Sequence, residues 1–290
     1  MNRHQAQTLR SLMFVPAISP QFIDKAHTRG ADAIIVDLED SIAPAMKQQA
    51  REALGDAVRR IAAHGLPVFV RVNNDPALLQ ADLDAAVQAP IAGIILPKAE
   101  DPRQIATVAD WLLASEAAHK VEAGSTSLVL LLESPMAIHR AGDLARSHTR
   151  VAAMAFGTED YATLLGVHPT LEAMRLPGYS LAIAARAHGL AAWGIAGSIG
   201  EFSDLALFGA MAGAARDAGF TGALAIHPKQ IAVLNEVFGV SEAEAREAAE
   251  IVATYERALT EGKGAVAHKG KMLDIPVVER ARQVVERAKR

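Results

Sequence analysis

The sequence predicts an α/β fold, a (β/α)8 TIM barrel followed by a C-terminal helical extension with a lid. Eight short apolar runs alternate with longer Ala-rich amphipathic stretches, which is the pattern of a parallel sheet covered by helices. The runs are apolar on both faces, as in strands that lie between a filled barrel and an outer layer of helices. A length of 290 residues suits one such barrel.

The elements are expected in strict alternation. The predicted strands comprise residues 11–15, 33–38, 67–72, 93–96, 128–132, 152–156, 191–195 and 223–226. The predicted helices comprise residues 20–29, 45–64, 79–88, 102–118, 136–147, 171–188, 203–217 and 228–238. A doubly wound open sheet is the structural alternative, but no Gly-x-Gly-x-x-Gly fingerprint follows an early strand, so its usual dinucleotide site is missing.

Residues beyond the eighth unit exceed what a barrel needs. We therefore predict a catalytic barrel over residues 1–240 and a helical extension over 241–290, with a helix near 241–261, a loop at 262–272 and a closing helix from about Ile275. The glycines at 262, 264 and 270 allow backbone conformations that a moving segment would use. The loop is either an active-site lid or an exposed linker.

Composition restricts the chemistry and the partners. Without cysteine, the chain has no disulfide, thiolate nucleophile or iron–sulfur cluster, so catalysis would use carboxylates, His, Lys, Arg or a hard metal, and a cytoplasmic location is expected. A net charge of -4 with scattered basic residues argues against nucleic acid as a partner. The polar N-terminal segment and the lack of a long apolar run argue against secretion and membrane insertion.

Polar side chains end most of the predicted strands, where barrel enzymes carry their catalytic groups. An apolar core alone would not favour this placement. The first strand runs from Arg10 to Pro16, and the later ends carry Asp37, Glu39 and Asp40, then Arg71 and Asn73, Lys98, Glu133, Glu159 and Asp160, and His227.

Two of these carboxylates, Glu133 and Asp160, come from adjacent strands and suggest a metal site. Mg2+ prefers carboxylate oxygens and keeps several waters that a substrate can displace. The alternative for Asp160, and for Asp37 to Asp40, is capping of a following helix. Arg71 either pairs with Asp37 or Glu39 or holds a substrate carboxylate through its planar guanidinium.

The strand ends also form a series of motifs that resembles a known family. They are Arg10-Ser-Leu-Met-Phe-Val-Pro16, Asp37-Leu-Glu-Asp40, Val70-Arg-Val-Asn73, Pro97-Lys98, Leu132-Glu-Ser134, Phe156-Gly-Thr-Glu-Asp160 and Ile226-His-Pro228. Together they resemble the citrate lyase β-subunit-like family of CoA-dependent carbon–carbon lyases within the HpcH/HpaI aldolase superfamily, and among its members the citramalyl-CoA and malyl-CoA lyases. The segment 264–274 is similar to the family's C-terminal lid motif.

The resemblance implies a role for each candidate. Glu133 and Asp160 would bind Mg2+, with Glu133 also near the substrate, and Arg71 would hold the carboxylate of the small acid. Asp274 would enter a neighbouring subunit's site as an acid or base, so a homo-oligomer, a trimer or a hexamer, is implied. Glu39 and Asp40 would orient metal waters or Arg71. Lys98 and Arg10 would face the thioester or the CoA phosphates.

The reaction that the resemblance implies is Mg2+-dependent cleavage of a 3-hydroxyacyl-CoA, citramalyl-CoA or malyl-CoA. Its products would be acetyl-CoA and an α-oxo acid, pyruvate or glyoxylate, with CoA forming part of the substrate. The alternatives are the β subunit of citrate lyase, malyl-CoA thioesterase and a malate synthase-like condensation. A CoA-independent pyruvate aldolase and a noncatalytic binding or regulatory protein also stay open.

Overall fold

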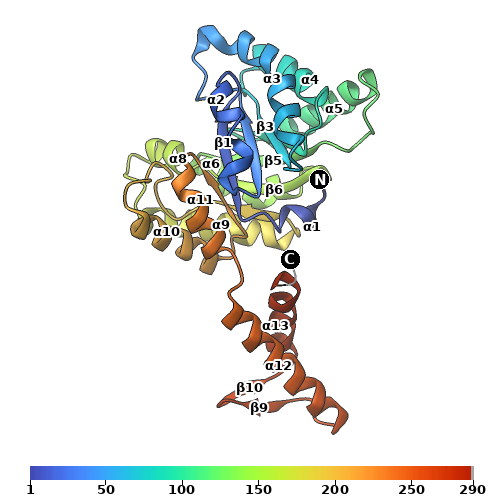
Figure 1. Ribbon diagram of the computed structural model, residues 1–290, viewed down its shortest axis with the longest axis vertical. Helices are drawn as coiled ribbons and strands as arrows, with labels where there is room; N and C mark the ends of the chain where they lie inside the picture. Colours follow the sequence, from blue (N-terminus) through green and yellow to red (C-terminus); the bar gives the residue numbers. More distant parts are fainter. Residues whose placement is uncertain (289–290) are drawn as a thin grey trace. The chain divides into compact units, whose positions relative to one another are not determined.

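The computed structural model describes residues 1–288, and eight parallel strands within that range form a nearly closed barrel (Figure 1). The strands lie in the order β7-β6-β5-β4-β3-β2-β1-β8. The predicted (β/α)8 barrel is therefore confirmed. The strands are β1 (Ser11–Pro16), β2 (Ala33–Asp37), β3 (Val68–Arg71), β4 (Gly93–Leu96), β5 (Ser127–Leu132), β6 (Val151–Phe156), β7 (Ala191–Trp193) and β8 (Ala223–Ala225).

The barrel closes between its two shortest strands, β7 and β8. Trp193 and Gly222 form a single parallel bridge, and the backbone N–H of Gly194 donates to the Gly222 carbonyl at 2.9 Å. A side chain at position 222 would collide with the Leu9 carbonyl and approach the Arg10 carbonyl to 2.9 Å. Glycine is needed there because the incoming chain crosses so close to the backbone that precedes β1.

Side chains alternate between the barrel interior and the helix layer. Leu12, Ile35, Phe69, Ile95 and Trp193 belong to the cluster that fills the interior. Their neighbours along the strands belong to the larger cluster under the helices. Both faces of each strand are therefore buried, which explains why the strands read as continuous apolar runs.

Helices surround the strands, and several begin at a proline that follows a capping side chain. Asp75, Asp101, Ser134 and His227 each accept a hydrogen bond from a backbone N–H of the first turn that follows. This combination is favourable because proline lacks the N–H that a helix start leaves unpaired. The long helices of the barrel are α3 (Lys47–Ala62), α4 (Pro76–Val87), α5 (Pro102–Ala118), α9 (Leu171–Ala187), α10 (Leu205–Ala218) and α11 (Pro228–Val237).

The short helices differ most from the sequence-based expectation. The helix expected at 20–29 is α2 (Pro20–Ile23) followed by a 3-10 turn at Ala26–Arg29, and the one expected at 136–147 is α6 (Pro135–His139) and α7 (Ala141–Ala145). The helices α1 (Arg3–Ala6) and α8 (Thr158–Leu165) were not predicted. Such short helices show too little periodicity to be recognised, since tertiary contacts stabilise them more than propensity does.

A second compact unit comprises Gly239–Arg290 and follows the barrel unit Met1–Phe238. Within it α12 (Glu242–Thr260) and α13 (Ile275–Ala288) pack together around Tyr255, Leu273 and Val278. The loop predicted at 262–272 contains a hairpin of β9 (Val266–His268) and β10 (Lys271–Leu273), so this part of the prediction was wrong. Lys269 and Gly270 both have positive φ, 46° and 77°, and make the two-residue turn of this hairpin.

No helix within residues 1–288 is both long and apolar enough to cross a bilayer.

A buried ion pair fixes the amino-terminal ends of β5 and β6. Glu116 at the end of α5 accepts hydrogen bonds from Nη1 and Nη2 of Arg150 at 2.7 Å, and from the backbone N–H groups of Gly124 and Thr126. Burial alone would raise the pKa of Glu116, but these hydrogen bonds outweigh burial and lower it to about 2. The pair therefore stabilises the fold above pH 4.5, and this contribution is lost as the pH falls towards 2.

We predict that Glu116→Gln lowers the free energy of unfolding by about 3 kcal/mol at pH 7, because Arg150 loses its buried partner. Urea unfolding at pH 7 and at pH 3 measures this, and the deficit should shrink at the lower pH. Glu122→Gln, an exposed carboxylate in the same connection, is the matched control. A deficit that does not change between pH 7 and pH 3 contradicts the ionic explanation.

Candidate active site

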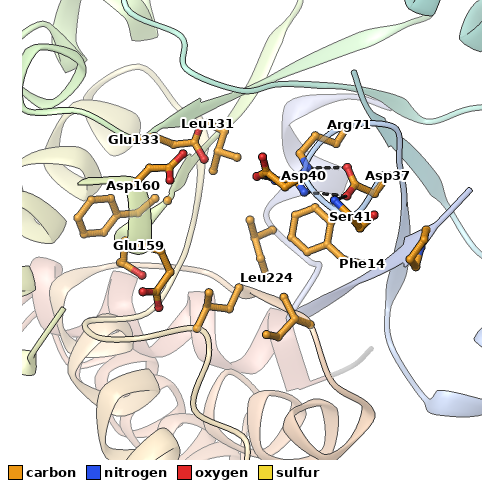
Figure 2. Close-up of a pocket in the computed structure, with 16 residues that line it drawn as sticks. Phe14, Asp37, Asp40, Ser41, Arg71, Leu131, Glu133, Glu159, Asp160 and Leu224 are labelled. Carbon is orange, nitrogen blue, oxygen red and sulfur yellow. Dashed lines mark hydrogen bonds and ion pairs between the residues drawn. The ribbon is translucent and has the colours of Figure 1, made fainter. Parts of the chain in front are cut away.

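A cavity of about 420 Å³ opens at the carboxyl ends of the strands. Figure 2 shows Glu133 and Asp160 on one side of it and Arg71 with Asp37 and Asp40 on the other. Apolar side chains, among them Phe14 and Leu224, line the space between these polar groups. The cavity therefore has an acidic side, a guanidinium side and an apolar floor.

Arg71 is held by Asp37, its register partner on β2. The guanidinium Nε donates to Oδ1 of Asp37 at 2.7 Å and Nη2 donates to Oδ2 at 2.8 Å, which is a bidentate pair. Asp37 also accepts from the backbone N–H groups of Glu39 and Ser41. Burial opposes ionisation of Asp37, but the hydrogen bonds from Arg71 outweigh it and lower the pKa of Asp37. The structural pairing considered for Arg71 is thus present.

Arg71 also contacts the two carboxylates that follow β2. Its Nη1 lies 3.0 Å from Oδ2 of Asp40 and 3.1 Å from Oε2 of Glu39. Its guanidinium carbon lies 4.6 Å from the centre of the Phe14 ring. Asp40 is the exposed member of the group, with 60% of its side chain accessible, against 9% for Glu39. A ligand carboxylate that approaches Arg71 would meet Asp40 first.

The Glu133 side chain reaches the cavity because the residue opposite it, Gly157, has no side chain. Glu133 follows β5, its side chain is buried, and its Oε2 accepts from the backbone N–H of Lys98 at 2.8 Å. A Cβ at position 157 would collide with Cγ of Glu133 and lie 2.7 Å from Oε1. Gly157, directly after β6, therefore leaves the space that this carboxylate fills.

Asp160 lies in the first turn of α8, after β6. The helix begins after Gly157 without a side-chain cap, so Asp160 is not the capping residue that was considered as its alternative role. Its carboxylate is 45% exposed and 3.8 Å from Nζ of Lys98. Glu159, next to it, accepts a hydrogen bond from the Ser198 hydroxyl at 2.5 Å.

The site carries more negative than positive charge. Five carboxylates, Asp37, Glu39, Asp40, Glu133 and Asp160, face two cations, Arg71 and Lys98. Burial, together with the charges of Glu39 and Asp160, raises the pKa of Glu133 to about 8. Burial is also the main reason that the pKa of Glu39 is raised. An additional cation would relieve this repulsion.

One predicted site residue of the barrel unit is not brought into this cluster. Arg10 precedes β1, at the opposite end of the strands, and its side chain binds Asp32 through Nε at 2.9 Å and Nη2 at 2.8 Å. Asp274 belongs to the C-terminal unit, where its carboxylate accepts weakly from the Val277 N–H at the start of α13, at 3.3 Å. The predicted contact between Arg10 and substrate has no support from this geometry.

One supporting residue was missed by the sequence analysis. Asp82, in the middle of α4, is almost fully buried and accepts from the backbone N–H and Nδ2 of Asn73 and from Nε of Arg51. Asn73 also donates to the Leu38 carbonyl at 3.0 Å. This network ties together the chain segments just after Arg71 and Asp37. A lone Asp among apolar residues of a helix was the available signal, because a buried carboxylate requires partners.

The candidate magnesium ligands of this site are the carboxylates of Glu133 and Asp160. Among residues 1–288, no group of three or more His, Asp or Glu side chains is arranged to enclose a metal ion. Magnesium does not need such a group, since it is usually bound by one or two carboxylates and keeps several waters. Glu133 and Asp160 supply two carboxylates at a site with excess negative charge, so the residues present fit this ion.

The fold and the site together define a (β/α)8-barrel enzyme with its polar groups at the carboxyl ends of the strands. A family model described as HpcH/HpaI aldolase/citrate lyase matches residues 10–228. The chain belongs to this family, which confirms the resemblance noted from the strand-end motifs.

Individual relatives align with nearly the full length of this chain. The citrate lyase subunit beta of Escherichia coli K12 is 32% identical over 99% of this chain and 96% of its own length. The L-malyl-CoA/beta-methylmalyl-CoA lyase of Rhodobacter capsulatus is also 32% identical, over 98% of this chain and 95% of its own. Both relatives are lyases, and the protein is a carbon–carbon lyase.

A solved relative has the same fold. The protein CitE of Mycobacterium tuberculosis, whose crystal structure is a complex with magnesium, acetoacetate and coenzyme A, is 26% identical and superposes with a TM-score of 0.77. The alignment covers 97% of this chain and 98% of that one.

We predict that Glu133→Gln stabilises the metal-free protein. The folded pKa of about 8 lies above the ordinary 4.5, so folding favours the protonated carboxyl group. The stability that this group contributes below pH 4.5 is lost as the pH rises to 8. In EDTA at pH 8.5 the variant should melt on the order of 5 °C higher than the unmodified protein. At pH 5 the two melting temperatures should agree, and a variant that is less stable at pH 8.5 contradicts the assignment.

Proposed function

We propose that the protein is a Mg2+-dependent lyase that cleaves a 3-hydroxyacyl-CoA thioester to acetyl-CoA and an α-oxo acid. The observation that supports this most directly is the pair Glu133 and Asp160 facing Arg71 across one cavity. A metal held by the carboxylates and a guanidinium opposite would suit a small acid that has both a hydroxyl and a carboxylate. The family relationship supports the same chemistry.

In this proposal Arg71 holds the substrate carboxylate. Its guanidinium uses one N–H on Nε and one on Nη2 for Asp37, so its position is fixed before any ligand arrives. The contact with the exposed Asp40 is the one that a ligand carboxylate would replace. Asp37 and the buried Glu39 then keep the guanidinium oriented.

Magnesium bound at Glu133 and Asp160 would stabilise negative charge on the substrate oxygens. During cleavage the substrate hydroxyl gives its proton to a base and becomes the oxo group of the α-oxo acid as the carbon–carbon bond breaks. The acetyl-CoA enolate then gains one proton on carbon, so the reaction takes up no net proton. We assign that last transfer to Asp274, supplied by a neighbouring subunit. A homo-oligomer, a trimer or hexamer, belongs to this proposal.

The acyl group is proposed to be citramalyl or malyl. The lyase relative from Rhodobacter capsulatus is named for malyl-CoA and beta-methylmalyl-CoA, and it covers this chain almost completely. The equally similar citrate lyase subunit beta supports a second candidate, action on a citryl thioester within a larger complex.

A substrate panel separates these candidates. The purified protein is incubated with (R)- and (S)-citramalyl-CoA, malyl-CoA and citryl-CoA, with Mg2+ or with EDTA, and acetyl-CoA and oxo-acid release are followed. Metal-dependent release from citramalyl- or malyl-CoA is expected. No release from any of them, but release from a citryl thioester on a carrier protein, would support the second candidate.

We predict that Asp160→Ala reduces turnover at least ~1000-fold and abolishes its Mg2+ dependence, because a metal ligand is lost. The matched control is Glu159→Ala, since this neighbouring carboxylate is bound by Ser198 and should be dispensable to within about tenfold. Circular dichroism establishes that both variants fold. Equal activity of the two variants would remove Asp160 from the metal site.

We also predict that Asp274→Asn lowers kcat at least ~100-fold while the affinities for Mg2+ and for pyruvate or glyoxylate stay near normal. Because Asp274 is assigned to a neighbouring subunit's site, mixed oligomers of Asp274→Asn and Asp160→Ala chains should regain activity that neither variant has. Mixed oligomers without activity would contradict action between subunits.

A further inference from the structure

Lys98 is attached to the carboxylate cluster at both its backbone and its side chain. Its backbone N–H donates to Oε2 of Glu133 at 2.8 Å. Its ammonium Nζ donates to Oε1 of Glu39 at 2.7 Å and lies 3.8 Å from Oδ2 of Asp160. One residue therefore contacts three separate carboxylates.

The backbone at Lys98 is in an unusual conformation that makes these contacts possible. Its φ is 51°, in the left-handed region that residues other than glycine rarely adopt. The Lys98 carbonyl accepts from Nδ2 of Asn74 at 3.2 Å, so both backbone polar groups are bound. Strain of this kind is retained where the surroundings require it, and it occurs often at functional sites.

We propose that Lys98 is the resident cation of the metal-free site, and that its ammonium leaves the carboxylates when a divalent cation binds at Glu133 and Asp160. This inference rests on the magnesium site of the proposed function. The ammonium and the metal compete for the same negative charge, so Lys98 sets the affinity for magnesium in addition to any contact that it makes with substrate.

The surroundings of Glu39 support the assignment of a mobile counter-ion. Its side chain is 9% exposed, and its Oε2 makes no hydrogen bond within the part of the chain that the structure describes, although Nη1 of Arg71 lies 3.1 Å away. The Lys98 ammonium is therefore the hydrogen-bond donor on which this buried carboxylate depends. When that donor leaves, Arg71 is close enough to take its place.

The Lys98 side chain has room to move. It is 48% exposed and lines a second cavity, of about 530 Å³, which also borders Glu133 and Asp160. The residues that line this cavity with them are Asn74, Glu100, Ser134, Thr163 and Leu164. Rotation of the side chain alone would take the ammonium into that space. The backbone N–H would keep its hydrogen bond to Glu133, so the metal ligand stays oriented while the competing charge departs.

Displacement of the Lys98 ammonium by Mg2+ has a different consequence from an ammonium that stays and supports the carboxylates. If the ammonium is displaced, its removal destabilises the metal-free protein and tightens magnesium binding, since the two effects are linked. If the ammonium stays and holds the carboxylates in the loaded site, its removal destabilises both forms and leaves binding equal or weaker.

The experiment is a calorimetric titration with Mg2+ alone, together with melting curves in EDTA and in saturating Mg2+. The variants are Lys98→Met and Lys98→Asn, the latter because asparagine tolerates left-handed backbone. Lys120→Met is the control for conformation, since Lys120 also has positive φ, 57°, and leads to the opposite end of β5. Lys47→Met controls for nearby charge, because among residues 1–288 Nζ of Lys47 binds only the carbonyls of Leu38 and Glu39.

Both Lys98 variants should bind Mg2+ about 5- to 50-fold more tightly than the unmodified protein, in keeping with the usual size of such couplings. They should melt at a lower temperature in EDTA, and the difference should shrink by at least half in saturating Mg2+. Neither control should tighten binding more than about twofold. If Lys98→Met does not fold, the results for Lys98→Asn alone test the inference.

Equal or weaker Mg2+ binding by the Lys98 variants, or a melting difference that persists in Mg2+, overturns the inference and leaves the magnesium site standing. An unmodified protein that binds no Mg2+ overturns both. The same tightening in Lys47→Met would mean that general charge, and not displacement of Lys98, sets the affinity.

Discussion

Excess negative charge at the carboxyl ends of the strands is the constraint on which the organisation of this site depends. Carboxylates at the ends of β2 and β5 and on α8 gather around one cavity, and three of the cluster, Asp37, Glu39 and Glu133, are buried. Buried carboxylates are costly unless they are paired, bound by a metal or protonated. Burial first, and then the charges of Glu39 and Asp160, raise the pKa of Glu133 to about 8. A cation bound at this site would offset part of this charge.

The two cations of the site differ in the freedom of their side chains. Arg71 is buried and its guanidinium is bound in a bidentate pair by Asp37, so it is a fixed part of the cavity wall. Lys98 is half exposed, its backbone N–H and carbonyl are both bound, and its ammonium is bound by the Glu39 carboxylate. The planar, rigid group thus lies where recognition of a carboxylate needs direction, and the flexible ammonium lies beside the carboxylates proposed for the metal.

Backbone features give the site its dimensions. Gly157 lets the Glu133 carboxylate pass close to the chain after β6, and Asp82 of α4 binds Asn73, which follows β3. Neither residue is among those proposed to bind magnesium or the substrate. Both act on the residues that do, because strand ends are followed by irregular chain that needs specific hydrogen bonds to hold one conformation. Within the C-terminal unit, two residues with positive φ determine the turn of the hairpin.

Much of this protein was determined by the sequence alone. The apolar runs predicted all eight strands to within a few residues, because strands buried on both faces cannot tolerate polar side chains. Polar residues at the strand ends identified Arg71, Lys98, Glu133 and Asp160, since parallel strands in a barrel bring their carboxyl ends to one rim. Local patterns were less informative for α6, α7, α8 and the hairpin, which are too short to show a period.

Only the tertiary structure decided how those side chains share their charges. It placed Arg10 at the far end of its strand beside Asp32, and it paired Arg71 with Asp37, where sequence left two possibilities open. It also brought the Lys98 ammonium to Glu39, a residue 59 positions away along the chain. Such contacts depend on distances of a few ångströms between separate strand ends. A one-dimensional pattern does not contain those distances, because they follow from the register and closure of the whole barrel.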